Sequence, residues 1–287
     1  MSVRALYDVP APAKLNLFLH VVGRRADGYH LLQSVFVLID WCDALHFERR
    51  ADGVLARHDL GAALPEDDLC LRAARALQAE SGTTLGADIA IDKQVPWGAG
   101  MGGGSSDAAS TLLALNRLWG LHWPRERLAA LGLELGADVP FFIGGRNAFV
   151  EGIGERLTPL PVLPTWLAVL KPPTPIETRA IFASPLLVRD TDPVILTGFL
   201  ADASGDFGRN DLQPPAEAQC AEVGVAREML QRCFGNARMT GSGSAVFARA
   251  GTGAEPTAAM PADLPPGWVG RMCRSLEQHP LVGWASS

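Results

Sequence analysis

The 287-residue sequence has no surplus of basic residues. Lys and Arg number 25 against 31 Asp and Glu, and the formal net charge is −6. A nucleic-acid-binding domain usually carries a basic surplus or a basic run. Arg24-Arg25 and Arg49-Arg50 are only doublets. The charge therefore argues against a nucleic-acid partner.

Cysteine is scarce and follows no pattern. Five are present, an odd number, and no pair has Cys-x-x-Cys spacing: Cys42, Cys70, Cys220, Cys233 and Cys273. This argues against a disulfide framework or a zinc site and predicts a reducing compartment.

Long apolar runs are missing as well. The run 15–22 follows Lys14, is interrupted by Asn16 and His20, and is too short to span a bilayer, and no signal peptide is visible. We therefore expect a cytoplasmic protein without a membrane segment.

Hydrophobic residues make up 48% of the chain, which is enough for one large or two ordinary domains. Apolar periodicity predicts strands near 15–22, 32–40, 87–91, 166–170, 238–240, 245–248 and 268–273. It predicts helices near 67–81, 107–119, 124–135 and 216–234, and a loop with at most a short helix at 251–265. Three prolines within 158–164 mark a domain boundary. The expected fold class is α+β, with an N-terminal domain 1–160 and a smaller C-terminal α/β sandwich domain 161–287.

A glycine-rich stretch precedes the helix expected at 107–119. Glycine permits positive φ and close approach of a ligand to the backbone, and a helix N-terminus favours an anion. We therefore expect a phosphate-binding loop, with the alternatives of a flexible linker for the stretch and a plain helix cap for Asp107. The residues expected to bind ATP are Pro96, Trp97, Gly98, Ala99, Gly100, Met101, Gly102, Gly103, Gly104, Ser105 and Ser106.

The loop does not match two common phosphate-binding signatures. No Gly-Lys-Ser/Thr follows its glycines, as a Walker A loop requires. Gly98, Gly100 and Gly103 form G-x-G-x-x-G, but no strand ending in an acidic residue follows about 20 positions later, as a dinucleotide-binding fold requires.

Several polar residues stand out from apolar surroundings. Lys14 and Asn16 share one strand face, which is either an exposed edge or the wall of a phosphate site. Asp138 lies between a helix stop at Gly136 and an apolar segment. It either caps a short helix or is a partly buried base. Tyr29 is one of only two tyrosines and follows a turn at 26–28.

Taken together, these segments resemble the GHMP kinase superfamily. The segments that carry the resemblance are 12–17 (PAKLNL), 28–30 (GYH), 96–109 (PWGAGMGGGSSDAA), 135–140 (LGADVP) and 240–244 (TGSGS). The first two are similar to the branch that acts on a cytidine diphosphate-linked substrate.

The resemblance implies ATP-dependent phosphorylation of the 2-hydroxyl of CDP-methylerythritol in non-mevalonate isoprenoid precursor biosynthesis. It implies that Asp138 is the base and Lys14 its cationic partner. It further implies that the small-molecule substrate is contacted by Asn16, Tyr29, His30, Thr178 and Phe182. Mg²⁺ would arrive with ATP, without a dedicated metal site.

Two other functions stay open from the sequence. One is a different kinase of the superfamily, against which Tyr29-His30 argues. The other is a catalytically inactive nucleotide sensor, which would need neither Lys14 nor Asp138. The sequence leaves open whether the chain is a monomer or a homodimer.

Overall fold

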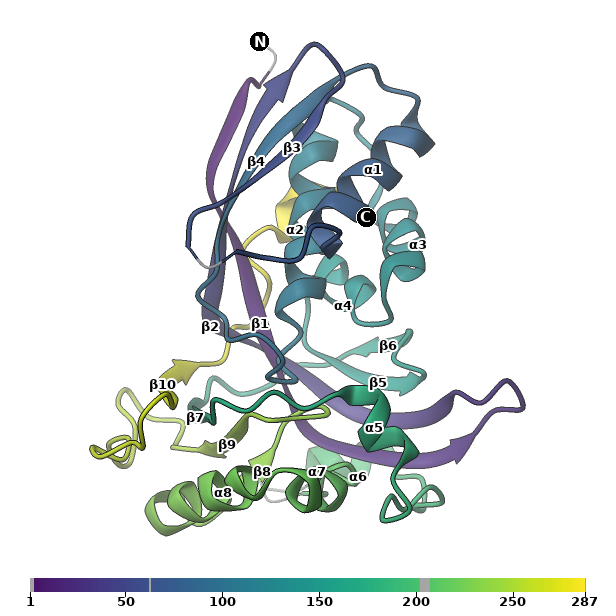
Figure 1. Cartoon of the computed structure of the whole chain (residues 1–287). Helices are drawn as coiled ribbons and strands as arrows, with labels where there is room; N and C mark the ends of the chain where they lie inside the picture. Colours follow the sequence, from purple (N-terminus) through teal and green to yellow (C-terminus); the bar gives the residue numbers. More distant parts are fainter. Residues whose placement is uncertain (1–2, 62, 202–206, 287) are drawn as a thin grey trace.

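The computed structural model describes residues 3–61, 63–201 and 207–286, and these form two bodies, each built on its own sheet (Figure 1). One sheet has six strands and the other four. In Figure 1 the six-stranded sheet lies above with helices on one face, and the four-stranded sheet lies below with helices beneath it.

The first sheet is organised around the long strand β2 (His30–Arg50). Strand β1 (Ala5–Arg24) pairs with it in antiparallel fashion from Ala5 to Arg24. On its other edge β2 pairs with β5 (Ala148–Gly152) through its first part and with β4 (Gly86–Asp92) through its last part. β3 (Leu55–Asp59) runs parallel to β4, and β6 (Arg156–Pro159) pairs with β5. The hairpin end of β1 and β2 extends beyond this sheet to the second body (Figure 1).

Helices α1 (Leu69–Ser81), α2 (Gly103–Leu118), α3 (Arg125–Leu135) and α4 (Val139–Gly144) cover one face of the first sheet. α2 is the central helix, because every residue from 106 to 116 is buried. α1 begins at Asp68, whose side chain accepts a hydrogen bond from Leu71 N, and ends at Gly82 in the left-handed conformation.

The second sheet has the order β10-β7-β9-β8 and is antiparallel throughout. Its strands are β7 (Trp166–Lys171), β8 (Arg238–Met239), β9 (Val246–Arg249) and β10 (Val269–Arg274). α7 (Gln213–Gln219) and α8 (Ala221–Phe234) pack on it, while α5 (Thr178–Ala183) and α6 (Leu196–Ala201) lie in the long connection after β7. A 3-10 turn (Val282–Trp284) then returns the chain to the helical core of the first body.

The predicted α+β class with two domains is confirmed, while the boundary at 160 stays a prediction. Two predicted helices were wrong in extent. The helix expected at 216–234 is two helices, because Cys220 has extended backbone angles (φ −139, ψ 97). The helix expected from Asp107 begins four residues earlier, at Gly103. The short helix considered within 251–265 does not form.

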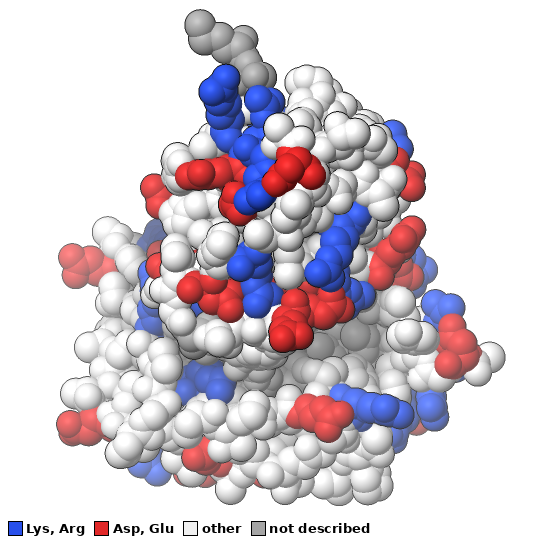
Figure 2. Space-filling model, turned by 45° about the horizontal axis from the view of Figure 1, so that its top comes forward, with Lys and Arg blue, Asp and Glu red and all other residues white. Residues whose placement is uncertain are grey.

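No helix in the described ranges is long and apolar enough to cross a membrane. On the face shown in Figure 2, the Lys and Arg side chains are interspersed with Asp and Glu, so that face carries no large patch of one sign.

Candidate active site

The glycine-rich loop alternates glycines in the left-handed region with buried apolar side chains. Gly98, Gly100 and Gly102 have φ of 64, 73 and 71, values that L-residues with a side chain rarely adopt. Ala99 and Met101 are 2% and 1% exposed and pack in the core between the two sheets. The apolar side chains thus anchor the loop from below, while the glycines leave its backbone accessible from the other side.

Backbone hydrogen bonds tie this loop to distant segments. Lys14 N donates to Met101 O (2.9 Å), Ser244 N to Gly98 O (3.2 Å) and Ala245 N to Ala99 O (3.1 Å). The fit is close, since a Cβ added at Gly100 would lie 2.5 Å from the carbonyl oxygen of residue 240. The loop is therefore held between β1 of the first body and the 240–244 turn of the second.

Two cavities meet at this loop. The larger has a volume of about 930 Å³ and the smaller about 550 Å³. Gly98, Gly100, Gly102 and Thr178 line both of them. Trp97 and the first turn of α2 line only the smaller cavity, and Trp97 is 65% exposed. A loop that borders two cavities can hold a phosphate chain from one side while an acceptor approaches from the other.

Lys14 and Asp138 come together in the larger cavity. Lys14 Nζ lies 3.4 Å from Asp138 Oδ2, and their side chains are 4% and 30% exposed. Lys14 also lies over the Phe36 ring, 4.2 Å from its centroid. Asp138 occupies the N-cap position of α4, but its side chain makes no capping hydrogen bond. The capping alternative is therefore wrong, and the carboxylate keeps lone pairs that can accept a proton.

Asn16 has a fixed orientation next to this pair. Its Oδ1 accepts from Lys14 Nζ (2.6 Å) and its Nδ2 donates to Ser34 Oγ (2.9 Å), which in turn donates to Phe18 O (2.5 Å). Its backbone N donates to Thr240 Oγ1 (2.8 Å). Sequence reasoning missed Ser34 as a site residue, although a serine inside the apolar segment 32–40 was a usable signal.

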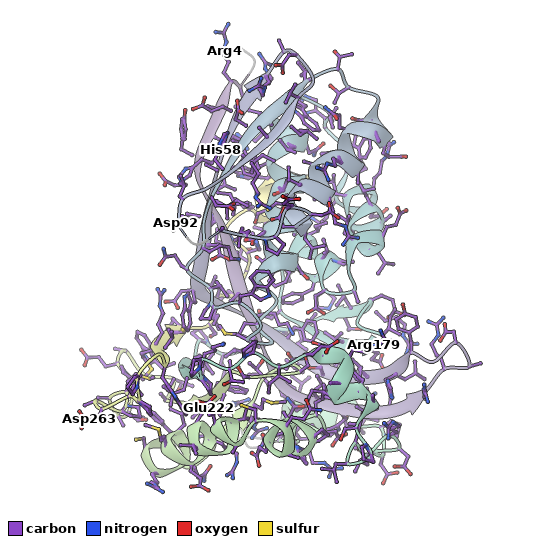
Figure 3. The ribbon with its side chains drawn as sticks, in the orientation of Figure 1. Arg4, His58, Asp92, Arg179, Glu222 and Asp263 are labelled. Carbon is purple, nitrogen blue, oxygen red and sulfur yellow. The ribbon has the colours of Figure 1, made fainter. Side chains whose placement is uncertain are left out.

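The predicted cytidine-site residues lie at the far rim of the same cavity. His30 and Phe182 are stacked, with ring centroids 4.9 Å apart and planes at 27°. Tyr29 is 60% exposed, and Thr178 Oγ1 shares a hydrogen bond with Ser242 Oγ (2.6 Å). All four predicted residues border the cavity that contains Asp138. In Figure 3, Arg179, which also lines it, lies on α5 at the level where the two bodies face each other.

Asp107 is not a helix cap. It lies in the second turn of α2 and is 3% exposed. Lys93 Nζ binds Asp107 Oδ2 (2.6 Å) and also Asp43 Oδ2, while Asp43 Oδ1 accepts from the backbone N of the two residues after Lys93. Burial, together with the charge of Asp43, raises the pKa of Asp107 to about 8 despite the lysine. This network clamps the entry of the glycine loop to α2.

Within the described ranges, no group of three or more His, Cys, Asp and Glu side chains is arranged to hold a metal ion. The two carboxylates that border the cavities closest to the loop are Asp107 and Asp138, and each already has a lysine partner.

Comparison with known proteins identifies the family to which the chain belongs. Residues 68–146 match the model of the GHMP kinases N terminal domain, and residues 197–260 match that of the GHMP kinases C terminal.

Two curated relatives cover the chain almost end to end. One from Methylibium petroleiphilum, named 4-diphosphocytidyl-2-C-methyl-D-erythritol kinase, is 71% identical and covers 99% of this chain and 100% of its own. One of the same name from Variovorax paradoxus is 57% identical with the same coverage.

Solved structures show the same relationship. A crystal structure of 4-(cytidine 5'-diphospho)-2C-methyl-D-erythritol kinase is 36% identical with a TM-score of 0.72 and covers 84% of this chain and 89% of its own. The homoserine kinase of Cytophaga hutchinsonii, at 15% identity and a TM-score of 0.66 over 88% of this chain and 87% of its own, shares the fold.

Proposed function

Since the chain belongs to the GHMP kinases, and within them to the 4-diphosphocytidyl-2-C-methyl-D-erythritol kinases, we propose how its own residues carry out the reaction of that family. The enzyme transfers a phosphoryl group from ATP to the 2-hydroxyl of CDP-methylerythritol, which gives the 2-phosphate and ADP in the non-mevalonate pathway to isoprenoid precursors. The site residues below are proposals.

The observation that carries the proposal is the position of the Lys14–Asp138 pair. It lies in the larger cavity, which meets the smaller one at the glycine loop. Phosphoryl transfer needs donor and acceptor in line and charge stabilisation at the moving group. ATP in the smaller cavity and the alcohol in the larger one meet that requirement at the loop.

Asp138 acts as the general base in this proposal. Its carboxylate has Lys14 as a partner on one oxygen and no capping role, so it can accept the hydroxyl proton as the phosphoryl group arrives. Lys14, whose Nζ lies 3.4 Å from the carboxylate, is close enough to stabilise the transferring group. Asn16 presents its amide next to Lys14 and orients the polyol.

ATP is bound by the loop from Pro96 to Ser106, with its phosphates at the free N–H groups of the first turn of α2. Ser105 of this turn lines the smaller cavity. We propose that Mg²⁺ is held mainly by the phosphates of ATP, because both nearby carboxylates have lysine partners. When bound, Mg²⁺ neutralises charge on those phosphates.

CDP-methylerythritol places its cytidine at Tyr29, His30, Thr178 and Phe182 in this proposal. The aromatic rings at that rim offer stacking surface, while the polyol end of the cavity is lined by Lys14, Asn16 and Asp138. We further propose that the enzyme works in the cytoplasm on this small molecule, without nucleic acid or membrane, as a monomer or homodimer.

A substrate panel tests the proposal. The purified chain with ATP and Mg²⁺ should release ADP rapidly with CDP-methylerythritol and very slowly with free methylerythritol, homoserine or mevalonate. Equal turnover of free methylerythritol would show that no cytidine site contributes, and preference for homoserine or mevalonate would replace the assigned substrate.

A further inference from the structure

Arg189 uses its guanidinium to connect the two sides of the cytidine rim. Its Nε donates to His30 Nε2 (3.2 Å), and its Nη2 donates to the carbonyl oxygens of Phe182 (3.0 Å) and Ser184 (2.9 Å). Its Nη1 donates to Leu187 O (3.0 Å). No ion pair joins Arg189 to a carboxylate within the described part of the chain. Arg189 therefore holds His30 of β2 against the end of α5.

This contact determines which nitrogen of His30 carries the proton. A guanidinium has only donors, so the ring nitrogen it contacts must be an acceptor. His30 Nε2 is that acceptor, and a neutral ring then carries its proton on Nδ1. Burial lowers the pKa of His30, and the positive charges of Arg189 and Arg24 lower it further, which favours the same neutral form.

The protonated nitrogen is available to a ligand. His30 lines the larger cavity, and Nδ1 has no hydrogen-bond partner among the side chains and backbone that the structure describes. The ring is also held in place by its stacking on Phe182, whose carbonyl Arg189 binds. Arg189 thus fixes both the orientation and the tautomer of His30.

We propose that Arg189 is a positioning residue that holds His30 as the neutral Nδ1–H tautomer against Phe182, so that His30 offers one hydrogen-bond donor to an acceptor atom of the cytosine ring. Cytosine has two such acceptors, O2 and N3. The opposite tautomer would present a lone pair to them and weaken binding. This inference deepens the proposed function and rests on the cytidine site assigned above.

The variant Arg189→Met tests the inference, because it removes the donors and keeps the aliphatic stem. KM for CDP-methylerythritol should rise by about 2- to 10-fold, the worth of one hydrogen bond, while KM for ATP stays unchanged. Arg189→Lys, which keeps a donor and the charge, should recover part of the loss. The matched control is Arg232→Met, since that side chain is 79% exposed and pairs with Glu228 on its own helix.

A pH profile separates this role from plain packing. In the wild type burial and the charges of Arg189 and Arg24 lower the pKa of His30 below its ordinary value of about 6.5, which favours the neutral ring. In Arg189→Met the pKa of His30 should rise, and its neutral ring becomes free to adopt the Nε2–H tautomer. Because imidazolium donates from both ring nitrogens, the KM defect for CDP-methylerythritol should be largest where the ring is neutral and should shrink as pH falls from 7 to 5.5. If KM of Arg189→Met exceeded the wild-type KM by the same factor at every pH, the proposal would be overturned and Arg189 would only anchor the loop.

Nitrogen NMR of histidine-labelled wild-type enzyme gives a readout that needs neither turnover nor a stable Arg189→Met variant. The His30 signals, assigned by their loss in His30→Gln, should show the Nδ1–H tautomer, and CMP should shift them. The Nε2–H tautomer in the wild type would refute the proposal. If the tautomer is Nδ1–H and CMP binds while CDP-methylerythritol is not phosphorylated, the proposed function fails and the positioning role stands.

Discussion

Asp138→Asn separates the catalytic interpretation of this site from a structural one. The substitution keeps the shape of the side chain but removes the base and the charge that faces Lys14. We expect kcat to fall by about 10²- to 10⁴-fold, as for loss of a general base, which corresponds to about 3–5 kcal/mol of barrier. ATP affinity should stay near the wild-type value, because the loop proposed to bind the phosphates is unchanged.

Asp138→Asn should lower the free energy of unfolding only slightly. Asp138 makes no capping hydrogen bond, and Lys14 keeps Asn16 Oδ1 at 2.6 Å and the Phe36 ring at 4.2 Å after the change. We therefore expect a loss of about 1 kcal/mol or less, since the pair is partly solvated at Asp138. Asp68→Ala is the contrasting variant: that side chain does cap α1, and its removal should cost about 0.5–2 kcal/mol.

The assay is steady-state ADP release at saturating ATP, with calorimetry for ATP binding and thermal unfolding for stability. Lys14→Met and the double variant Lys14→Met/Asp138→Asn complete a double-mutant cycle. If the two groups act as a unit, the double variant should lose much less than the product of the two single losses. A kcat for Asp138→Asn within a few-fold of the wild type would refute the role of Asp138 as base.

Three further predictions concern Tyr29 at the cavity rim, Gly100 in the glycine-rich loop and Asp107, which binds Lys93. Tyr29→Ala should raise KM for CDP-methylerythritol by about 5- to 150-fold, the loss of one stacking contact, with KM for ATP unchanged; an unchanged KM for CDP-methylerythritol would exclude stacking on Tyr29. Gly100→Ala should lower stability by about 2 kcal/mol or more, because φ is 73 and the new Cβ would lie 2.5 Å from a carbonyl oxygen. Gly104→Ala, whose Cβ meets its nearest atom only at 3.6 Å, should retain its Tm, and equal Tm values for both variants would contradict the strain argument. As pH rises from 5 to 8.5, the Tm of Asp107→Asn should increase relative to the Tm of the wild type. Ionisation of a buried group whose pKa is raised from 3.8 to about 8 costs the folded state stability over that range, and a relative loss of Tm would show that the ionised carboxylate stabilises.

Local patterns predicted the elements well where each pattern was complete in itself. Asp68 and Gly82 bracket α1 as an N-cap and a C-cap, and the helix ends at the residue that the glycine indicates. Strands near 87–91 and 166–170 lie within β4 and β7. The break at Cys220 was not visible, because helix-compatible residues run through it and the extended backbone there is set by packing against the second sheet.

The start of α2 shows why the glycine loop itself was misjudged. A run of three glycines predicts loop, yet Gly103 and Gly104 are helical. Asp107 was a candidate cap, but a partly buried lysine 14 positions earlier in the chain binds it instead. Tertiary contacts overrode the low helix propensity of glycine there. Nothing within the local sequence records that contact.

The site residues also divide into those that a local pattern could predict and those that depend on contacts between distant segments. Lys14 and Asn16 could be paired from strand periodicity alone, because residues two apart point to one face. Their partners could not, since Asn16 binds Thr240 across 224 positions and Arg189 binds His30 across 159. Asp138, the proposed base, and the glycine loop come from the first body, while Thr240, Phe182 and Arg189 come from segments that follow β7. Because β1 and the hairpin end of β2 extend into the second body, Lys14 and His30 lie on strands that both bodies contact. A change in how the two bodies pack would therefore move the proposed base, the proposed phosphate loop and the proposed cytidine rim relative to one another. We therefore expect the reaction to depend on their packing as much as on any single side chain.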